Sequence, residues 1–281
     1  MIRQRGSLIV KKVLLFLMLL VIAFFVLFPL YWIITMSIKE KADILKVIPD
    51  YITRRITAAN YEEIFKNGIF LTYLRNSLIV AIGTTLLCCC VSAMAGFGLT
   101  RYNFRSKSAI SVGVFIVRMI PSLIYIVPMY MIYSKLGMLD TRYGLILAYC
   151  TFSLPLSIWL FINFFNEIPY EIYESAIIDG ASEYALFTKI ALPLVLPSIS
   201  VVTILTFIGA WNEFGLALVL TFHDNVKTLP IGINSLIQEQ RDTPFGSIAA
   251  AGVLVMTPAI VLSISSQKYI VKGLTAGAVK G

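Results

Sequence analysis

The sequence predicts an all-α membrane protein with six transmembrane helices, and three observations support this fold class. Hydrophobic residues make up 58% of the 281 residues and charged residues only 14%, against about 25% charged residues in a typical soluble domain. Six separate stretches are apolar over the roughly 20 residues that a helix needs to cross a bilayer. The longest polar interval, residues 39–75, is too short to bury a core of its own.

The six predicted spans follow one another with short polar connections. They cover residues 13–38, 76–100, 108–134, 143–166, 193–222 and 247–267. The first span is longer than the apolar region of a cleavable signal, and no small-residue cleavage site follows it, so we expect an uncleaved helix. Residues 1–12 and 273–281 then form the N-terminal and C-terminal tails of one membrane domain, residues 13–272.

Aromatic residues and prolines predict details of these elements. Tyr31 and Trp32 close the first span, where an interfacial aromatic belt is expected. Asn60 is expected to cap a short surface helix in the interval 39–75. Membrane helices tolerate proline where a neighbour or a water-lined cavity satisfies the freed carbonyl groups, and interrupted helices favour a translocation path over a static bundle. Five prolines fall within predicted spans: Pro121, Pro128, Pro155, Pro197 and Pro258.

The net charge of +8 follows the positive-inside rule and does not indicate nucleic-acid binding, because the basic residues flank spans and form no stripe. With the N-terminus in the cytoplasm, the interval 39–75 is an exception, since its seven basic residues are offset by five acidic ones. The two later outside loops carry four basic residues, whereas the cytoplasmic segments carry eleven: Arg3, Arg5, Lys11, Lys12, Arg101, Arg105, Lys107, Lys189, Lys268, Lys272 and Lys280.

Several kinds of chemistry are excluded by the residues present. With His223 as the sole histidine, neither a two-histidine metal site nor a serine–histidine–aspartate triad can be built, and His223 is expected to be a solvated loop residue. Adjacent cysteines in one helix point in different directions, so the run Cys88–Cys90 predicts packing and not a metal cluster. No glycine-rich phosphate-binding loop is present. We therefore expect no catalytic residue, metal or cofactor in this chain.

A polar helical segment with a glycine break, residues 167–193, lies between two long apolar runs. Pro169 suits the first turn of a helix, and Gly180 supplies the backbone freedom that ends one. The apolar face of the first helix is expected to carry Ile168, Ile172, Tyr173, Ala176 and Ile177, and that of the second helix Tyr184, Phe187 and Ala191. The acidic residues Glu167, Glu171, Glu174, Asp179 and Glu183 lie on the cytoplasmic side, where a docking surface for a partner protein explains them.

This segment resembles the EAA signature of the membrane subunits of binding-protein-dependent ABC importers, E-A-A-x3-G-x9-I-x-L-P. Glu174, Ala176, Gly180, Ile190, Leu192 and Pro193 match it, and Ser175 replaces the usual alanine. From about Leu27 to the C-terminus the chain resembles the second permease subunit of the maltose-type carbohydrate importers. That resemblance rests also on Asn76 and Ser77, Pro121, Pro128 to Tyr130, Leu136 and Gly137, Trp211 to Phe214, and the tail Gly273 to Gly281.

The resemblance implies a pore-forming permease subunit in the bacterial inner membrane, with both termini in the cytoplasm. Its implied protein partners are a second homologous permease, two cytoplasmic ATP-binding subunits and an extracytoplasmic solute-binding protein. The lipid bilayer surrounds the subunit. The resemblance also implies ATP-driven alternating access, with ATP hydrolysed by a separate subunit, and carbohydrate as the solute. ATPase coupling is implied for Glu174, Ser175, Ala176, Asp179 and Gly180. The alternative is a self-contained secondary transporter or channel, which leaves the EAA segment unexplained.

Two ionisable residues fall within predicted spans, where a charge is costly without a purpose. At about 1.5 Å per residue, Arg118 lies roughly 16 Å from the start of its span and Glu213 roughly 30 Å along the fifth span, which disfavours a direct pair. Arg118, Trp211, Asn212 and Glu213 are the candidates for the substrate pathway. Packing of Trp211 and an ion pair with a partner subunit stay open as alternatives. An arginine facing the solute would suit an acidic carbohydrate.

Overall fold

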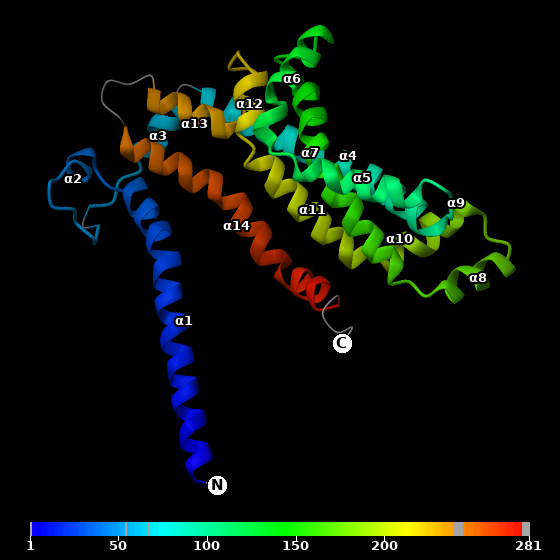
Figure 1. The fold of residues 1–281 in the computed structure, drawn as a ribbon. Helices are drawn as coiled ribbons and strands as arrows, with labels where there is room; N and C mark the ends of the chain where they lie inside the picture. The colour runs from blue at the N-terminus through cyan, green and yellow to red at the C-terminus, as the bar shows by residue number, and fades with distance from the viewer. Residues whose placement is uncertain (1, 54, 67, 239–243, 277–281) are drawn as a thin grey trace. The chain divides into compact units, whose positions relative to one another are not determined.

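The computed structural model describes residues 2–53, 55–66, 68–238 and 244–276 (Figure 1). Within the helices, it describes no side chain for residues 2–10, 118, 122–123, 197–198, 236–238 and 266–276. Every regular element of the described residues is a helix, and a single antiparallel bridge joins Lys39 to Ile56. The prediction of an all-α fold is confirmed.

Helices of very different lengths follow one another along the described chain. They are α1 (Ile2–Ser37), α2 (Lys41–Ile44), α3 (Ala59–Lys66), α4 (Ile69–Arg101), α5 (Lys107–Met119), α6 (Ser122–Lys135), α7 (Arg142–Asn166), α8 (Tyr170–Ile178), α9 (Glu183–Ala185), the π-helix η1 (Leu186–Ala191), α10 (Leu192–Leu194), α11 (Leu196–Trp211), α12 (Gly215–Leu220), α13 (Leu229–Gln238) and α14 (Phe245–Ala276).

Four of the six predicted spans are single helices that are long and apolar enough to cross a membrane. They are Lys11–Ser37 of α1, the whole of α4, the whole of α7, and Phe245–Ser265 of α14. The fourth prediction, residues 143–166, agrees with α7 to within one residue. Helix α4 begins at Ile69, seven residues before the predicted start of the second span at Asn76.

The third predicted span, residues 108–134, is two helices and not one. Helix α5 ends at Met119, Ile120 has extended backbone angles, and α6 begins after Pro121. Proline lacks the amide hydrogen needed to continue a helix, and it disfavours helical angles in the residue before it, so the break falls here. The other predicted proline breaks are wrong for Pro128, Pro155 and Pro258, because α6, α7 and α14 run through them.

The fifth predicted span, residues 193–222, is also divided. Pro193 lies in the short α10, a new helix α11 begins at Leu196, and the chain breaks again between Trp211 and Gly215. At this second break the two carboxylate oxygens of Glu213 accept hydrogen bonds from the backbone N–H groups of Leu216 (3.0 Å) and Ala217 (3.2 Å). Helices leave their first N–H groups unpaired, so Glu213 starts α12 as a cap.

The described residues form two compact units, of which the first contains Met1–Gly68 and Ser235–Met256. In this first unit, Asn60 is buried and its amide donates to the carbonyl groups of Ser37 and Lys39, both at 2.9 Å. The prediction that Asn60 caps α3 is wrong. The Thr57 hydroxyl accepts from the N–H of Ala59 at the start of α3, which leaves Asn60 free to hold the end of α1.

The second unit contains Ile69–Asn234 and Thr257–Gly281, and its core lies among α4, α7 and α11. Helices α4 and α7 pack closely, so that a Cβ atom at Gly96 would lie 2.6 Å from the Cβ atom of Phe161. Small residues allow membrane helices to approach this closely. Phe161 stacks on Phe165, and Phe97 meets Phe165 edge to face. This aromatic cluster is the base on which residues 167–193 rest.

Candidate functional site

Helix α8 and the turn after it have the geometry that the sequence predicts. Pro169 precedes the first residue of α8, with extended backbone angles. At the other end, the N–H of Gly180 donates to the carbonyl of Ile177, and the N–H of Ala181 donates to the carbonyl of Ala176, both at 2.9 Å. This is the Schellman pattern, which needs a left-handed residue, and Gly180 has φ +80°.

The second arm is irregular where the sequence predicts a plain helix. The Ser182 hydroxyl accepts a hydrogen bond from the N–H of Ala185 at 3.3 Å and so starts α9. The chain then widens into the π-helix η1 before α10. Wide turns of this kind are rare and occur often at functional sites. We call the whole segment, residues 167–193, the hairpin.

One stripe of the hairpin packs on the aromatic cluster of the second unit. Tyr173, Ala176, Leu186 and Ala191 are buried there, among side chains that include Phe97. The ring of Phe97 has its centroid 6.3 Å from that of Tyr173 and 5.1 Å from that of Phe187. These contacts hold both arms of the hairpin against the inner core of the unit.

The opposite side of the hairpin is open and carries both apolar and acidic groups. Ile178 is 85% exposed and Tyr184 is 76% exposed. The predicted apolar face is therefore only partly buried. Helix α8 is nine residues long and buries Tyr173 and Ala176, whereas Ile172 and Ile177 are exposed. Of the candidate coupling residues, Ala176 is buried, and four are exposed: Glu174, Ser175, Asp179 and Gly180.

Arg101 is a residue of this site that sequence reasoning missed. Its guanidinium lies 3.4 Å from the Glu183 carboxylate, and it covers the rings of Tyr170 and Tyr173 at 5.8 and 5.6 Å. The Tyr102 hydroxyl donates to the other oxygen of Glu183 at 2.8 Å. Glu183 therefore has partners within the chain, and Arg101 ties the end of α4 to both arms of the hairpin. The available sequence signal is that one predicted cytoplasmic turn, residues 101–107, is basic and another cytoplasmic segment, residues 167–193, is acidic.

The three candidate pathway residues whose side chains are described have different surroundings. Trp211 is buried and stacks on Phe207 with ring centroids 5.7 Å apart. Asn212 is exposed, and its amide donates to the carbonyl of Ile208. Glu213 lines a cavity of about 170 Å³ between α7 and α11 while it caps α12. The side chain of Arg118 lies outside the described residues.

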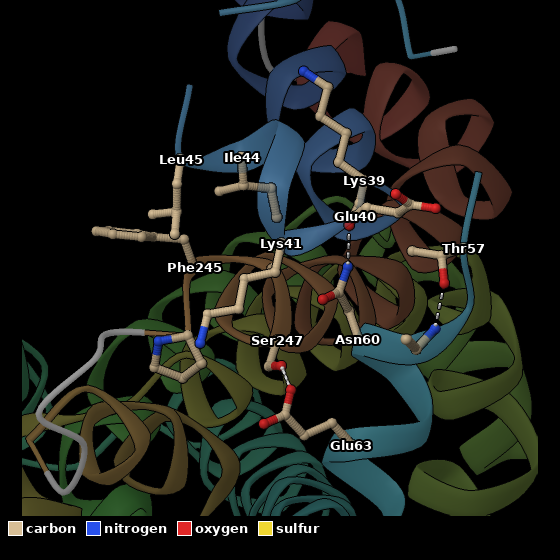
Figure 2. A pocket seen from close by; sticks show the side chains of 13 residues that line it. Lys39, Glu40, Lys41, Ile44, Leu45, Thr57, Asn60, Glu63, Phe245 and Ser247 are labelled. Atoms are coloured by element: carbon tan, nitrogen blue, oxygen red, sulfur yellow. Dashed lines mark hydrogen bonds between the residues drawn. The ribbon is translucent and has the colours of Figure 1, made fainter. Parts of the chain in front are cut away.

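A separate pocket of about 380 Å³ lies within the first unit (Figure 2). Phe245 supplies an apolar wall, and Asn60, Glu63 and Ser247 supply polar groups. The Ser247 hydroxyl donates to Glu63 at 2.6 Å. A Cβ atom at Gly246 would lie 2.3 Å from the Asn60 side-chain oxygen. Glu63 and Ser247 thus hold α3 against the first turn of α14, and Asn60 holds α3 against the end of α1.

A polar cluster joins the α6–α7 loop to the loop after α12. Asp140, with φ +56°, accepts hydrogen bonds from the N–H groups of Phe222 and His223 and pairs with the His223 ring at 2.5 Å. His223 is exposed as expected, but it has this partner. Partial burial raises the pKa of Asp140, and these hydrogen bonds together lower it by a larger amount. The pKa of Asp140 therefore lies below its usual value.

This pKa shift predicts how the loop contact depends on pH. A carboxylate with a lowered folded-state pKa stabilises the fold above its unfolded pKa, and that contribution is lost as the pH falls through the folded value. Asp140→Asn should therefore lower the melting temperature at pH 7, and the difference should shrink as the pH falls below about 4. Asparagine tolerates the left-handed backbone. Thermal unfolding of both proteins in detergent across this range measures the difference, and closure of the gap between pH 7 and 6 would contradict the assignment to Asp140.

Comparison with known proteins places this geometry in a family. Residues 89–276, which include Arg101, the hairpin and Glu213, match the binding-protein-dependent transport system inner membrane components. The chain belongs to this family. The permease is 34% identical over 276 residues to the trehalose/maltose transport system permease protein MalG of Thermococcus litoralis, across 97% of this chain and 98% of that protein. It is 37% identical over 260 residues to the trehalose transport system permease protein SugB of Mycobacterium tuberculosis, across 92% and 93%.

A solved structure shares the fold of the permease. A chain of a bacterial ABC transporter involved in the import of the acidic polysaccharide alginate superposes with a TM-score of 0.83 at 20% identity, across 94% of this chain and 97% of that one. The family match and the two relatives confirm the resemblance to the maltose-type carbohydrate permeases. The permease is an inner membrane protein of a sugar ABC importer family, whose members are transport subunits.

Proposed function

We propose that this chain is one of two permease subunits that form the pore of an ABC importer for a carbohydrate. Two cytoplasmic ATP-binding subunits hydrolyse ATP, a second, homologous permease completes the pore, and an extracytoplasmic binding protein delivers the solute. The relatives named for trehalose and maltose support a sugar. The four long apolar helices, together with the divided third and fifth spans, fit six crossings with both termini in the cytoplasm.

The observation that carries this proposal is the open side of the hairpin. An exposed apolar pair, Ile178 and Tyr184, stands beside the exposed acids Glu174 and Asp179. An amphipathic segment that is held rigidly on one side and open on the other is suited to lie in a groove of a partner. We propose that Glu174, Ser175, Asp179 and Gly180 meet the ATP-binding subunit, and that Ala176 positions them from within the core.

Direct contacts connect the hairpin to the membrane helices, so that movement of the hairpin would move them as well. Arg101 joins the hairpin to the end of α4, and the stripe of Tyr173 and Leu186 joins it to the core among α4, α7 and α11. Movement of the hairpin on ATP-driven closure of the ATPases would therefore tilt these helices together. This is the physical basis that we propose for alternating access between inward-facing and outward-facing states.

The solute path is proposed to pass Arg118, Asn212 and Glu213, with Trp211 supporting them by packing. The exposure of Asn212 and the cavity that Glu213 lines support this path, because both side chains can form hydrogen bonds with sugar hydroxyl groups. A neutral oligosaccharide agrees with the relatives. An acidic one would use Arg118, and Arg118→Met would then abolish stimulation by uronic-acid substrates while sparing stimulation by neutral ones.

Copurification tests the proposed assembly. When the chain carries an affinity tag and is expressed with its neighbouring reading frames, it should bring down an ATP-binding protein and a second permease. The ATPase activity of this complex in nanodiscs should rise several-fold with sugar-loaded binding protein. An impermeant thiol reagent should label Ser182→Cys only from the cytoplasmic side, in a background without the four native cysteines. Sugar uptake by the purified chain alone, driven by an ion gradient, would instead establish a secondary transporter.

A further inference from the structure

The segment after α2 in the first unit exposes an unusual run of aliphatic side chains. Val47 is 98% exposed, Ile48 is 82% exposed and Ile52 is 75% exposed, and Leu45, Tyr51 and Ile56 are exposed as well. Single exposed apolar residues are ordinary on protein surfaces, but a contiguous group marks an interaction site. We call residues 45–52 the aliphatic loop.

The aliphatic loop folds back along the first span. Helix α1 ends at Ser37, yet the Tyr31 hydroxyl donates to the carbonyl of Tyr51 at 2.5 Å. The rings of Trp32 and Tyr51 have centroids 5.8 Å apart. Tyr31 lies six residues before the end of α1, which is about 9 Å back along the helix axis. Figure 1 shows this loop beside the C-terminal end of α1.

The loop therefore lies beside the part of α1 where an interfacial aromatic belt is expected. Tyrosine and tryptophan gather where a span leaves the hydrocarbon, because one part of each ring is apolar and another is polar. Tyr31 and Trp32 are such residues, at the end of the apolar stretch Lys11–Ser37. Side chains that stand out from a loop at this level face the boundary between headgroups and acyl chains.

The charged side chains of the loop have partners within the chain. The ammonium group of Lys46 lies 2.6 Å from the Asp43 carboxylate and 2.8 Å from that of Asp50. Lys39 is buried, donates to the carbonyl of Asp50, and lies 4.7 Å from the centroid of the Trp32 ring. The loop therefore presents aliphatic groups outward and keeps its ionic groups turned toward one another, as entry into an apolar medium requires.

We propose that Val47, Ile48 and Ile52 insert into the bilayer leaflet at the C-terminal end of α1, so that the aliphatic loop is a lipid anchor beside the first span. Burial of apolar side chains at the headgroup boundary is the mechanism by which monotopic segments hold a surface. The anchor fixes the first unit against the membrane at a second point. It depends neither on the identity of the solute nor on which side of the membrane the loop lies.

Site-directed spin labelling of the whole transporter in nanodiscs tests this anchor. A nitroxide at Ile48→Cys, in a background without the native cysteines, should collide with lipid-soluble oxygen several-fold more often than with a water-soluble nickel chelate. The matched control is Glu62→Cys, an exposed position of α3 in the same unit, where the nickel chelate should dominate.

Two outcomes would overturn the proposal. Dominance of the nickel chelate at Ile48 would place the loop in water. Protection from both reagents would place it against protein, either the second permease or the binding protein. Val47→Cys gives an independent reading where Ile48→Cys fails to assemble, because the Val47 side chain is almost fully exposed and its replacement removes no packing.

Discussion

Gly180→Val is expected to release the ATP-binding subunits while the permease stays folded in the membrane. Gly180 has φ +80°, and a Cβ atom added there would meet nothing within 4 Å. The cost is therefore purely conformational, about 1–2 kcal/mol for a left-handed residue with a side chain, and it falls on the Schellman turn that sets the angle between the two arms. Stoichiometry of ATPase to permease after affinity purification measures the effect.

Gly137→Val is the matched control for this experiment. Gly137 has φ +65° with nothing within 4 Å, so the same substitution imposes the same strain at a turn far from the hairpin. Full ATPase recovery with Gly137→Val and loss with Gly180→Val would locate the contact. Reversal of both acids, Glu174→Lys with Asp179→Lys, should also release the ATPase, because it changes the sign of the exposed surface without straining the backbone. A purified variant that retains stoichiometric ATPase and still transports would contradict the coupling role.

Gly96→Ala is expected to destabilise the permease strongly, although it adds a single methyl group. The new Cβ atom would lie 2.6 Å from the Phe161 Cβ atom and 3.1 Å from the Phe161 carbonyl carbon. Because one of these neighbours is backbone, α4 and α7 must separate, and overpacking of this kind typically costs 1–3 kcal/mol. The melting temperature in detergent should fall clearly below that of the wild type.

The same substitution two residues along α4 supplies the control. A Cβ atom at Gly98 would meet nothing within 4 Å, and alanine favours a helix over glycine by up to about 1 kcal/mol. Gly98→Ala should therefore leave the melting temperature unchanged or raise it. Equal destabilisation by both variants would show that the effect is not due to contact with α7.

The parts of the fold that follow from local rules could be predicted from the sequence. Long apolar runs gave α1, α4, α7 and α14, and a proline followed later by a glycine gave α8 and its turn. What could not be predicted depends on tertiary partners. Pro121 breaks a helix while Pro155 does not, and the local sequence does not distinguish them.

The candidate site shows the same division. The exposure of Glu174 and Asp179 follows from the pattern of α8, but Arg101 is remote in sequence, and only packing brings it over Tyr170 and Tyr173. The sequence predicts Glu213 to be a costly carboxylate within a span, and in the structure it lies at the break between α11 and α12. The groups that offset this cost are backbone N–H groups of the next helix, and a search for an opposite charge could not have found them.

The capped joint at Glu213 also has a mechanical consequence. Because both carboxyl oxygens bind the first turn of α12, bending at this joint would break two hydrogen bonds and leave the Glu213 side chain without these partners. The joint is therefore a stiff elbow and not a hinge. If the hairpin displaces α11, the joint would bend little and α12 would move together with α11. The two helices would then behave as one rigid body.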